Sequence, residues 1–92
     1  MIKLLIVAEV YDEEYSEIVD GSSFNPKYPE IDKVIEWPVV PRVGEWFYFA
    51  DSEAIGRVLN IFHFRDKNGN PEIRVCCYVT ISDYESLKKA GW

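Results

Sequence analysis

The chain has 92 residues, a formal net charge of -6, 48% hydrophobic residues and 15% aromatic residues. This length and balance predict one globular domain over residues 1–92 and exclude a multidomain enzyme, a coiled coil, a repeat array and a disordered chain. The apolar run Leu4–Ala8 falls far short of the ~20 residues that a membrane-spanning helix needs, so we expect no membrane partner.

The charge is unevenly distributed along the chain. Residues 1–54 hold four bases and twelve acids, whereas residues 55–92 hold six bases and four acids, so the local net charges are -8 and +2. An acidic chain repels phosphate groups on average, which disfavours nucleic acid as the partner. The excess of basic residues after residue 54 keeps nucleic acid as an alternative partner.

The cysteines are adjacent, at Cys76 and Cys77, and the chain has one histidine. Neighbouring side chains of a strand point to opposite faces, so these two thiols are not placed to bond each other. A structural zinc site needs more Cys and His ligands than this chain supplies. We therefore expect no metal, no cofactor and free thiols in a reducing compartment. The N-terminus lacks the pattern of a secretory signal, and we expect a cytoplasmic protein.

Strand patterns begin at the N-terminus. Residues 2–11 alternate so that one face collects the apolar residues Ile2, Leu4, Ile6, Ala8 and Val10. The acidic run over residues 12–20 is compatible with a strand extension or a turn, and residues 21–29 form a turn-rich loop. Residues 31–37 predict a second strand. Prolines at positions 38 and 41 and Gly44 then force a bend before a third strand over residues 46–49.

The strongest local signal is a hairpin around Asn68-Gly69, between runs over residues 56–65 and 72–81. A two-residue turn with positive φ at both positions sets the register, so Phe62 faces Val75. The inner face then holds Val58, Asn60, Phe62, Phe64, Ile73, Val75, Cys77 and Val79. The outer face holds Arg57, Leu59, Ile61, His63, Arg65, Glu72, Arg74, Cys76, Tyr78 and Thr80.

A short helix is predicted to end the chain. Ser82 and Glu85 form a capping box at its start, and Gly91 occupies the position of a C-terminal cap. About five strands at near-regular spacing with one terminal helix predict a mainly β fold, a small, partly open antiparallel barrel.

The outer face of the 56–81 hairpin is the candidate binding surface, because its charge sign differs from the rest of the chain and it mixes apolar and basic side chains. The residues nominated are Arg57, Ile61, His63, Arg65, Arg74 and Tyr78. The leading hypothesis is a small non-catalytic module that binds a protein partner; the alternative is a nucleic-acid-binding barrel. The terminal helix covering this face, and a homodimer through a free sheet edge, remain open alternatives.

Catalytic and metal sites are not predicted. His63 and Cys76 share the outer face in this register, but they are not opposite each other and no third group orients them. We expect no enzyme activity. The acidic residues between Asp12 and Asp20 lack the spacing of a calcium-binding loop, so a solvated face is the expected role.

The run Pro41-Arg42-Val43-Gly44-Glu45-Trp46, followed by Ile55-Gly56-Arg57-Val58-Leu59-Asn60-Ile61, resembles the opening of SH3-like small barrels. KOW-type domains show a similar pairing, as do short uncharacterised bacterial and phage proteins. The resemblance covers residues 38–81, about half of the chain. It implies an SH3-like barrel, and the KOW-type likeness implies RNA or ribosomal partners.

Overall fold

The structure, a computed structural model, describes residues 1–18, 22, 24–49 and 52–92. Its strands are β1 (Ile2–Glu9), β2 (Ile31–Trp37), β3 (Trp46–Phe49), β4 (Ala54–Arg65) and β5 (Pro71–Tyr78). A 3-10 turn, η1 (Tyr15–Glu17), follows β1, and the helix α1 (Ile81–Lys89) follows β5. The predicted bounds of the second and third strands are confirmed.

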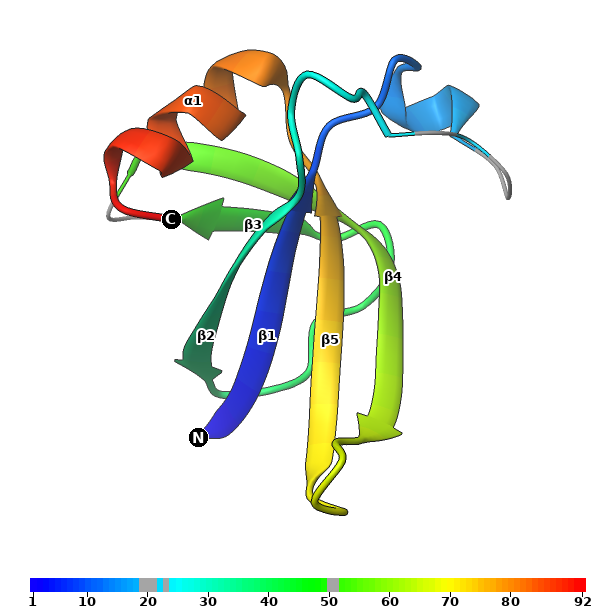
Figure 1. Cartoon of the computed structure of the whole chain (residues 1–92), viewed down its shortest axis with the longest axis vertical. Helices are drawn as coiled ribbons and strands as arrows, with labels where there is room; N and C mark the ends of the chain where they lie inside the picture. Colours follow the sequence, from blue (N-terminus) through cyan, green and yellow to red (C-terminus); the bar gives the residue numbers. More distant parts are fainter. Residues whose placement is uncertain (19–21, 23, 50–51) are drawn as a thin grey trace.

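The strands form one curled sheet in the order β2-β1-β5-β4-β3. β1 and β5 are parallel, and the other three neighbouring pairs are antiparallel. The mainly β, partly open barrel is therefore confirmed, with one parallel pair where we expected only antiparallel ones. α1 lies across one end of the curled sheet, and the β4–β5 hairpin projects at the other end (Figure 1).

The core fills the inside of the curl. Leu4, Ile6 and Ala8 are fully buried there, as their alternation predicted. β4 is long enough to serve two partners, because its first residues pair with β3 and its later residues pair with β5. Gly56 lies where this strand crosses the core, with the Cys77 Cβ and the Phe49 ring within 3.1 Å of the position a Cβ would take.

The hairpin turn differs from the predicted one. The Asp66 N–H donates to the Asn70 carbonyl at 2.9 Å, and of the loop residues 67–69 only Gly69 has positive φ, at +81°. The Asp66 carboxylate accepts the N–H groups of Asn68 and Asn70, each at 2.9 Å. This Asp66 cap stabilises a three-residue loop in place of the two-residue turn, and the register moves by one residue.

Because of the shifted register, the side chains of residues 60–64 in β4 project from the faces opposite to those predicted. Phe62 pairs with Arg74, and Ile61 pairs with Val75. A bulge at Leu59, between Val58 and Asn60, then returns Val58 to the core, where it is fully buried. The assignment of Asn60, Phe62 and Phe64 to the inner face was therefore wrong. These three side chains lie on the outer face, and the side chains of Ile61 and His63 lie on the inner one.

The terminal helix begins two residues earlier than predicted. Its N-cap is Thr80, whose hydroxyl accepts the Asp83 N–H at 3.1 Å, so the assignment of the cap to Ser82 was wrong. The predicted end is confirmed, because Gly91 has φ of +95°. The N–H groups of Gly91 and Trp92 return to the carbonyls of Lys88 and Leu87, which is the Schellman arrangement. Within the described part of the chain, no helix has the length and apolar character needed to cross a bilayer.

Candidate functional site

One transverse row of side chains crosses the outer face of the sheet. Leu5 pairs with Val34 on one side and with Arg74 on the other, and Arg74 pairs with Phe62. Paired residues project from the same face, so these four form a strip over four strands, called here the outer row. Val34 is 60% exposed and Phe62 is 51% exposed, whereas Leu5 and Arg74 are partly buried.

Arg74 is the only charged member of the outer row. Its guanidinium carbon lies 5.1 Å from the centre of the Phe64 ring, and Phe64 is itself 36% exposed. The Arg74 Nε is buried and has no hydrogen-bond partner among the described residues. A shallow hollow of about 370 Å³ lies here, lined by Phe62, His63, Phe64 and Arg74. This end of the outer face therefore combines two exposed aromatic rings with an unsatisfied donor.

The opposite end of the outer face is covered by the segment after β1. The Tyr15 ring packs edge-on against Tyr78 at 6.0 Å, and its hydroxyl donates to the Val58 carbonyl at 3.3 Å. Arg57 lies 4.2 Å from the centre of the Tyr15 ring and 5.0 Å from that of Trp46. Its Nε donates to the Gly44 carbonyl at 3.0 Å. Arg57 and Tyr78 thus make contacts within the fold.

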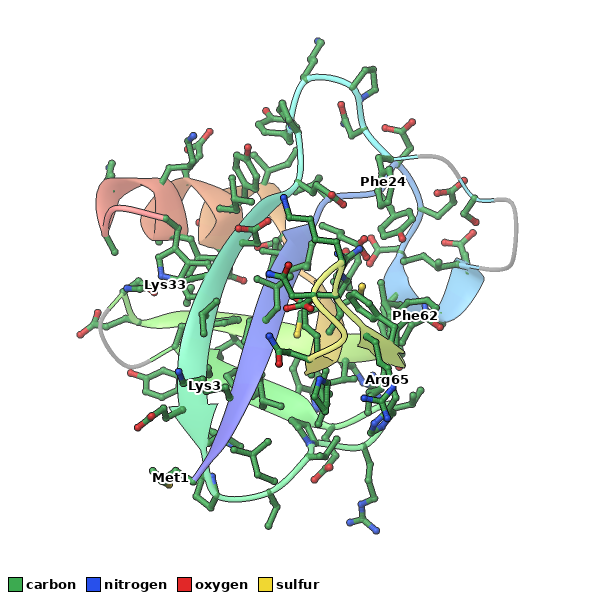
Figure 2. All side chains as sticks on the ribbon, turned by 60° about the horizontal axis from the view of Figure 1, so that its bottom comes forward. Met1, Lys3, Phe24, Lys33, Phe62 and Arg65 are labelled. Atoms are coloured by element: carbon green, nitrogen blue, oxygen red, sulfur yellow. The ribbon has the colours of Figure 1, made fainter. Side chains whose placement is uncertain are left out.

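The six nominated binding residues do not form one surface. Arg57, Arg74 and Tyr78 lie on the outer face as predicted, and two of them are engaged as just described. Ile61 and His63 lie on the inner side, where Ile61 packs against the core. Arg65 pairs with Pro71 and so projects from the same side as His63, which means that its assignment to the outer face was also wrong. It is exposed beside the hairpin turn and donates to the Gly69 carbonyl at 2.9 Å. Figure 2 views the molecule from the hairpin end, with Phe62 and Arg65 labelled.

His63 and Cys76 lie on opposite faces, because Cys76 pairs with Asn60 and His63 pairs with Ile73. We predicted that both side chains lie on the outer face. That prediction was wrong because the two-residue turn that it assumed sets a register one residue away from the observed one. Burial, and to a smaller extent the charge of Glu9, raise the pKa of Cys76 to about 12. Very little thiolate is present near neutral pH, so this thiol is a poor nucleophile.

Glu9 is a titratable group that sequence reasoning missed. Its side chain is only 5% exposed although it lies on the outer face, where it pairs with Tyr78. Burial raises its pKa to about 7, and the charge of Glu30 adds to the shift. The Tyr11 hydroxyl donates to Glu9 Oε1 at 3.2 Å, and this hydrogen bond lowers the pKa of Glu9 in opposition to burial. The only signal in the sequence was a single carboxylate at the end of an apolar strand.

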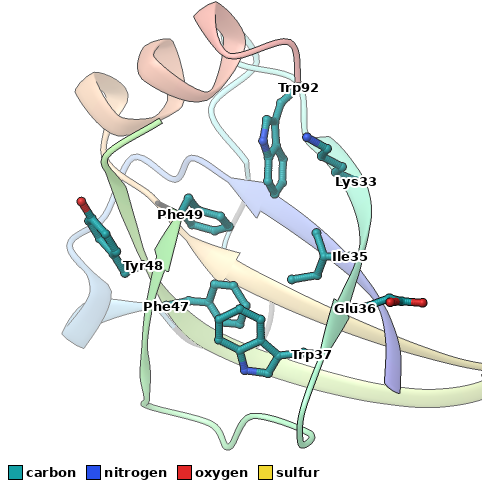
Figure 3. Close-up of a pocket in the computed structure, with 8 residues that line it drawn as sticks. All are labelled: Lys33, Ile35, Glu36, Trp37, Phe47, Tyr48, Phe49 and Trp92. Carbon is teal, nitrogen blue, oxygen red and sulfur yellow. The ribbon is translucent and has the colours of Figure 1, made fainter. Parts of the chain in front are cut away.

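A second candidate site lies where the two edge strands of the sheet, β2 and β3, approach each other (Figure 3). The pocket between them measures about 270 Å³ and is called here the seam pocket. It is lined by Lys33, Ile35, Glu36, Trp37, Phe47, Tyr48, Phe49 and Trp92. Sequence reasoning missed it because its walls come from three segments far apart in the chain. The aromatic run 46–49 was the only hint.

The described residues contain no cluster of three or more His, Cys, Asp or Glu side chains that could hold a metal ion. Comparisons of the chain with protein-family models, with curated proteins and with solved structures find no match. The resemblance to SH3-like barrels therefore stays a prediction at the level of the fold.

Proposed function

We propose that this protein is a non-catalytic interaction module that binds a protein partner through the outer row and the adjoining Phe64. The observation that carries the proposal is the pairing of Phe62, which is half-exposed, with Arg74, whose Nε has no partner among the described residues. A bound protein removes the ring from water and supplies an acceptor, such as a carbonyl or carboxylate, to the guanidinium.

The energetics favour this type of contact. Fully burying a Phe side chain is worth about 1.5–3 kcal/mol, and an unmade hydrogen bond at a buried donor costs about 1–3 kcal/mol. Phe62 and Arg74 are adjacent, so one bound protein can both bury the Phe62 ring and make the missing hydrogen bond to Arg74. Aromatic and Arg side chains are also enriched where protein interfaces concentrate their binding energy. Val34 extends the apolar contact to the far edge of the sheet.

The charges around the outer row favour a protein over a nucleic acid. Asp32, Glu36 and Glu72 project from the same face, since they pair with Val7, Lys3 and Phe64. Lys3 and Arg74 are the bases among the strand residues that flank or form the row. A phosphate backbone laid across the sheet meets more carboxylates than bases, and it releases few counterions on binding.

A nucleic-acid-binding barrel remains the second candidate, because of one specific observation. Phe62 and Phe64 are two residues apart on one strand, so their exposed rings lie on the same face beside Arg74. Bases stack on aromatic rings in such an arrangement. Fluorescence titration with single-stranded RNA and DNA at low salt tests this candidate: saturable, salt-sensitive binding supports it, and the absence of binding removes it.

The direct test of the protein-binding proposal is site-specific photo-crosslinking in cells of the source organism. A photoreactive phenylalanine analogue replaces Phe62 in one variant and Val39 in the control. Val39 is 63% exposed and lies in the connection between β2 and β3, away from the outer row. We expect a discrete adduct from position 62, with another protein or with a second copy of this chain, and none from position 39. The same adducts from both positions, or none from position 62, contradict the proposal.

A further inference from the structure

The walls of the seam pocket come from the core-facing side of the two edge strands. On β2, Ile35 pairs with the fully buried Leu4, and Trp37 lies two residues further along on the same face. On β3, Phe47 and Phe49 are each only 4% exposed. β2 and β3 are the two ends of the strand order, so among the described residues the seam between them is filled by these side chains.

Aromatic rings follow one another along the seam. The Trp37 and Phe47 rings meet at one end, with their centres 4.7 Å apart, and the centres of Phe47 and Phe49 are 5.2 Å apart. At the other end the Trp92 ring lies 5.1 Å from that of Phe49 and packs edge-on against it. The pocket is therefore closed at both ends by aromatic rings.

The position of Trp92 follows from the end of α1. Gly91 adopts positive φ, so the chain reverses and the Trp92 N–H bonds to the Leu87 carbonyl at 3.1 Å. This arrangement brings the residue after the glycine back against the last turn of the helix. The indole is consequently held against the core, and it forms a wall of the seam pocket without any ligand being needed to place it.

The side chains that point into the pocket are apolar. Figure 3 shows one space surrounded by Ile35, Trp37, Phe47, Phe49 and Trp92. The Tyr48 ring and the Glu36 carboxylate point away from this space. The Lys33 ammonium lies 5.7 Å from the centre of the Trp92 ring and takes part in a further interaction within the fold. Neither charged group is therefore assigned to a ligand in the pocket.

We propose that the seam pocket binds a neutral compound with a single aromatic ring, of the size of benzyl alcohol. Aromatic pairs prefer edge-on or offset arrangements, and the tilted and edge-on rings of the walls leave a further ring the same choice. The volume of about 270 Å³ is just below the ~300–1,000 Å³ of pockets for drug-sized ligands, which favours a single ring. The pocket lies on the core-facing side of the sheet, so this proposal does not depend on the outer row.

The same walls argue against other ligand classes. A charged ligand loses its hydration on entering an apolar pocket, and a buried charge is costly unless it is paired. An extended peptide needs a groove that is open at both ends, whereas Trp37 and Phe47 close one end and Trp92 closes the other. An aliphatic ring of the same size fills the same volume, but it has no π-system to face the aromatic walls and is expected to bind more weakly.

The test uses the three indole N–H resonances of the ¹⁵N-labelled protein as position markers. Trp37 and Trp92 line the pocket, whereas Trp46 is 68% exposed and stacks on Arg57 outside it. Benzyl alcohol, its aliphatic analogue cyclohexylmethanol, and the ions benzoate and benzylammonium are titrated in turn. With benzyl alcohol we expect saturable shifts of the Trp37 and Trp92 resonances and an unchanged Trp46 resonance. We expect affinities at least about threefold weaker for cyclohexylmethanol and at least about tenfold weaker for each ion.

Three variants test whether the aromatic wall is responsible. Trp37 is 36% exposed, so Trp37→Leu is expected to fold, and to weaken benzyl alcohol binding at least about threefold as followed by the Trp92 resonance. Trp37→Phe keeps a ring at this end and is expected to retain most of the affinity. Trp46→Leu makes the matched change outside the pocket and is expected to leave the affinity unchanged. Cyclohexylmethanol or either ion binding as tightly as benzyl alcohol, shifts that do not saturate, or an unchanged affinity in a folded Trp37→Leu protein overturn the proposal.

Discussion

Phe62 and Arg74 face each other across the β4–β5 ladder on the outer face of the sheet, which places an exposed aromatic ring beside a guanidinium with an unsatisfied Nε. This pairing would be lost if the register between β4 and β5 shifted by one residue. The two-residue turn expected from Asn68-Gly69 would have placed Phe62 opposite Val75 in the core. The Asp66 cap and the three-residue loop set the observed register, and several consequences can be measured.

The turn type predicts different responses at two neighbouring positions. Gly69 has φ of +81° with open space around it, so Gly69→Ala is expected to lower the free energy of unfolding by about 1 kcal/mol through backbone strain alone. Asn68 does not have positive φ, and Asn68→Ala is expected to cost less than about 0.5 kcal/mol. Urea denaturation of both variants checks this. Equal losses would support the two-residue turn instead.

Close packing at Gly56 predicts a larger loss from a single methyl group. An added Cβ would lie 3.1 Å from both the Cys77 Cβ and the Phe49 ring, and 3.3 Å from Val79. These neighbours are buried and have little room to move, so Gly56→Ala is expected to lower the free energy of unfolding by about 1–3 kcal/mol. The urea midpoint measures this loss. A midpoint equal to that of the wild-type protein would show that the core is looser than described.

The N-cap of α1 is tested by two substitutions. The Thr80 hydroxyl accepts the Asp83 N–H, so Thr80→Ala is expected to cost about 1 kcal/mol. Ser82 lies inside the helix, where Ala is the better helix former, so Ser82→Ala is expected to be neutral or slightly stabilising. Thermal unfolding followed by circular dichroism compares them. A larger loss of stability in Ser82→Ala than in Thr80→Ala would indicate that Ser82 is the N-cap, as the sequence suggested.

The buried carboxyl of Glu9 makes stability depend on pH. Its pKa is about 7 in the folded protein against an ordinary value of 4.5, so between these values the folded state holds a proton that the unfolded chain has released. The contribution of Glu9 to stability therefore falls as pH rises from about 4.5 to 7, by about 1–3 kcal/mol.

Glu9→Gln removes this titration while keeping an acceptor for the Tyr11 hydroxyl. The free energy of unfolding of the variant, relative to that of the wild-type protein, is expected to increase as pH rises from 4.5 to 7.5 and to level off above. Urea titrations at four or five pH values measure the difference, in which the other carboxyl groups cancel. A difference that is constant with pH would show that Glu9 is solvated.

Much of the fold followed from local patterns, because alternation and turn residues are short-range signals. The apolar parity of β1, the bounds of β2 and β3, and the glycine after α1 were all predicted correctly. Asn68-Gly69 suits two turn types, and the choice between them came from the Asp66 side chain. The bulge at Leu59 left no clear mark in the sequence, so the face of residues 60–64 was assigned wrongly.

The candidate sites were less predictable because each joins distant segments. The outer row requires the parallel pairing of β1 with β5, which no local sequence pattern predicts. The seam pocket needs β2, β3 and Trp92 to meet. Burial of Glu9 needs the chain after β1 to fold back, as the contact between the Tyr11 and Phe24 rings at 5.1 Å shows. The acidic run was expected to reach Asp20, which lies outside the described residues, as do Gly21 and Ser23 of the expected loop.

The most direct measurement compares photo-crosslinking yields from two exposed positions of β4, 62 and 55. Phe62 is 51% exposed and pairs with Arg74, whereas Ile55 is 44% exposed and pairs with Tyr48, in the part of β4 that pairs with β3. We predict that the analogue at position 62 gives a discrete protein adduct, that this adduct is lost when Arg74→Glu is added, and that position 55 gives at most a small fraction of the yield. An equal or greater yield from position 55 would contradict the proposal, because the binding surface would then not lie beside Arg74.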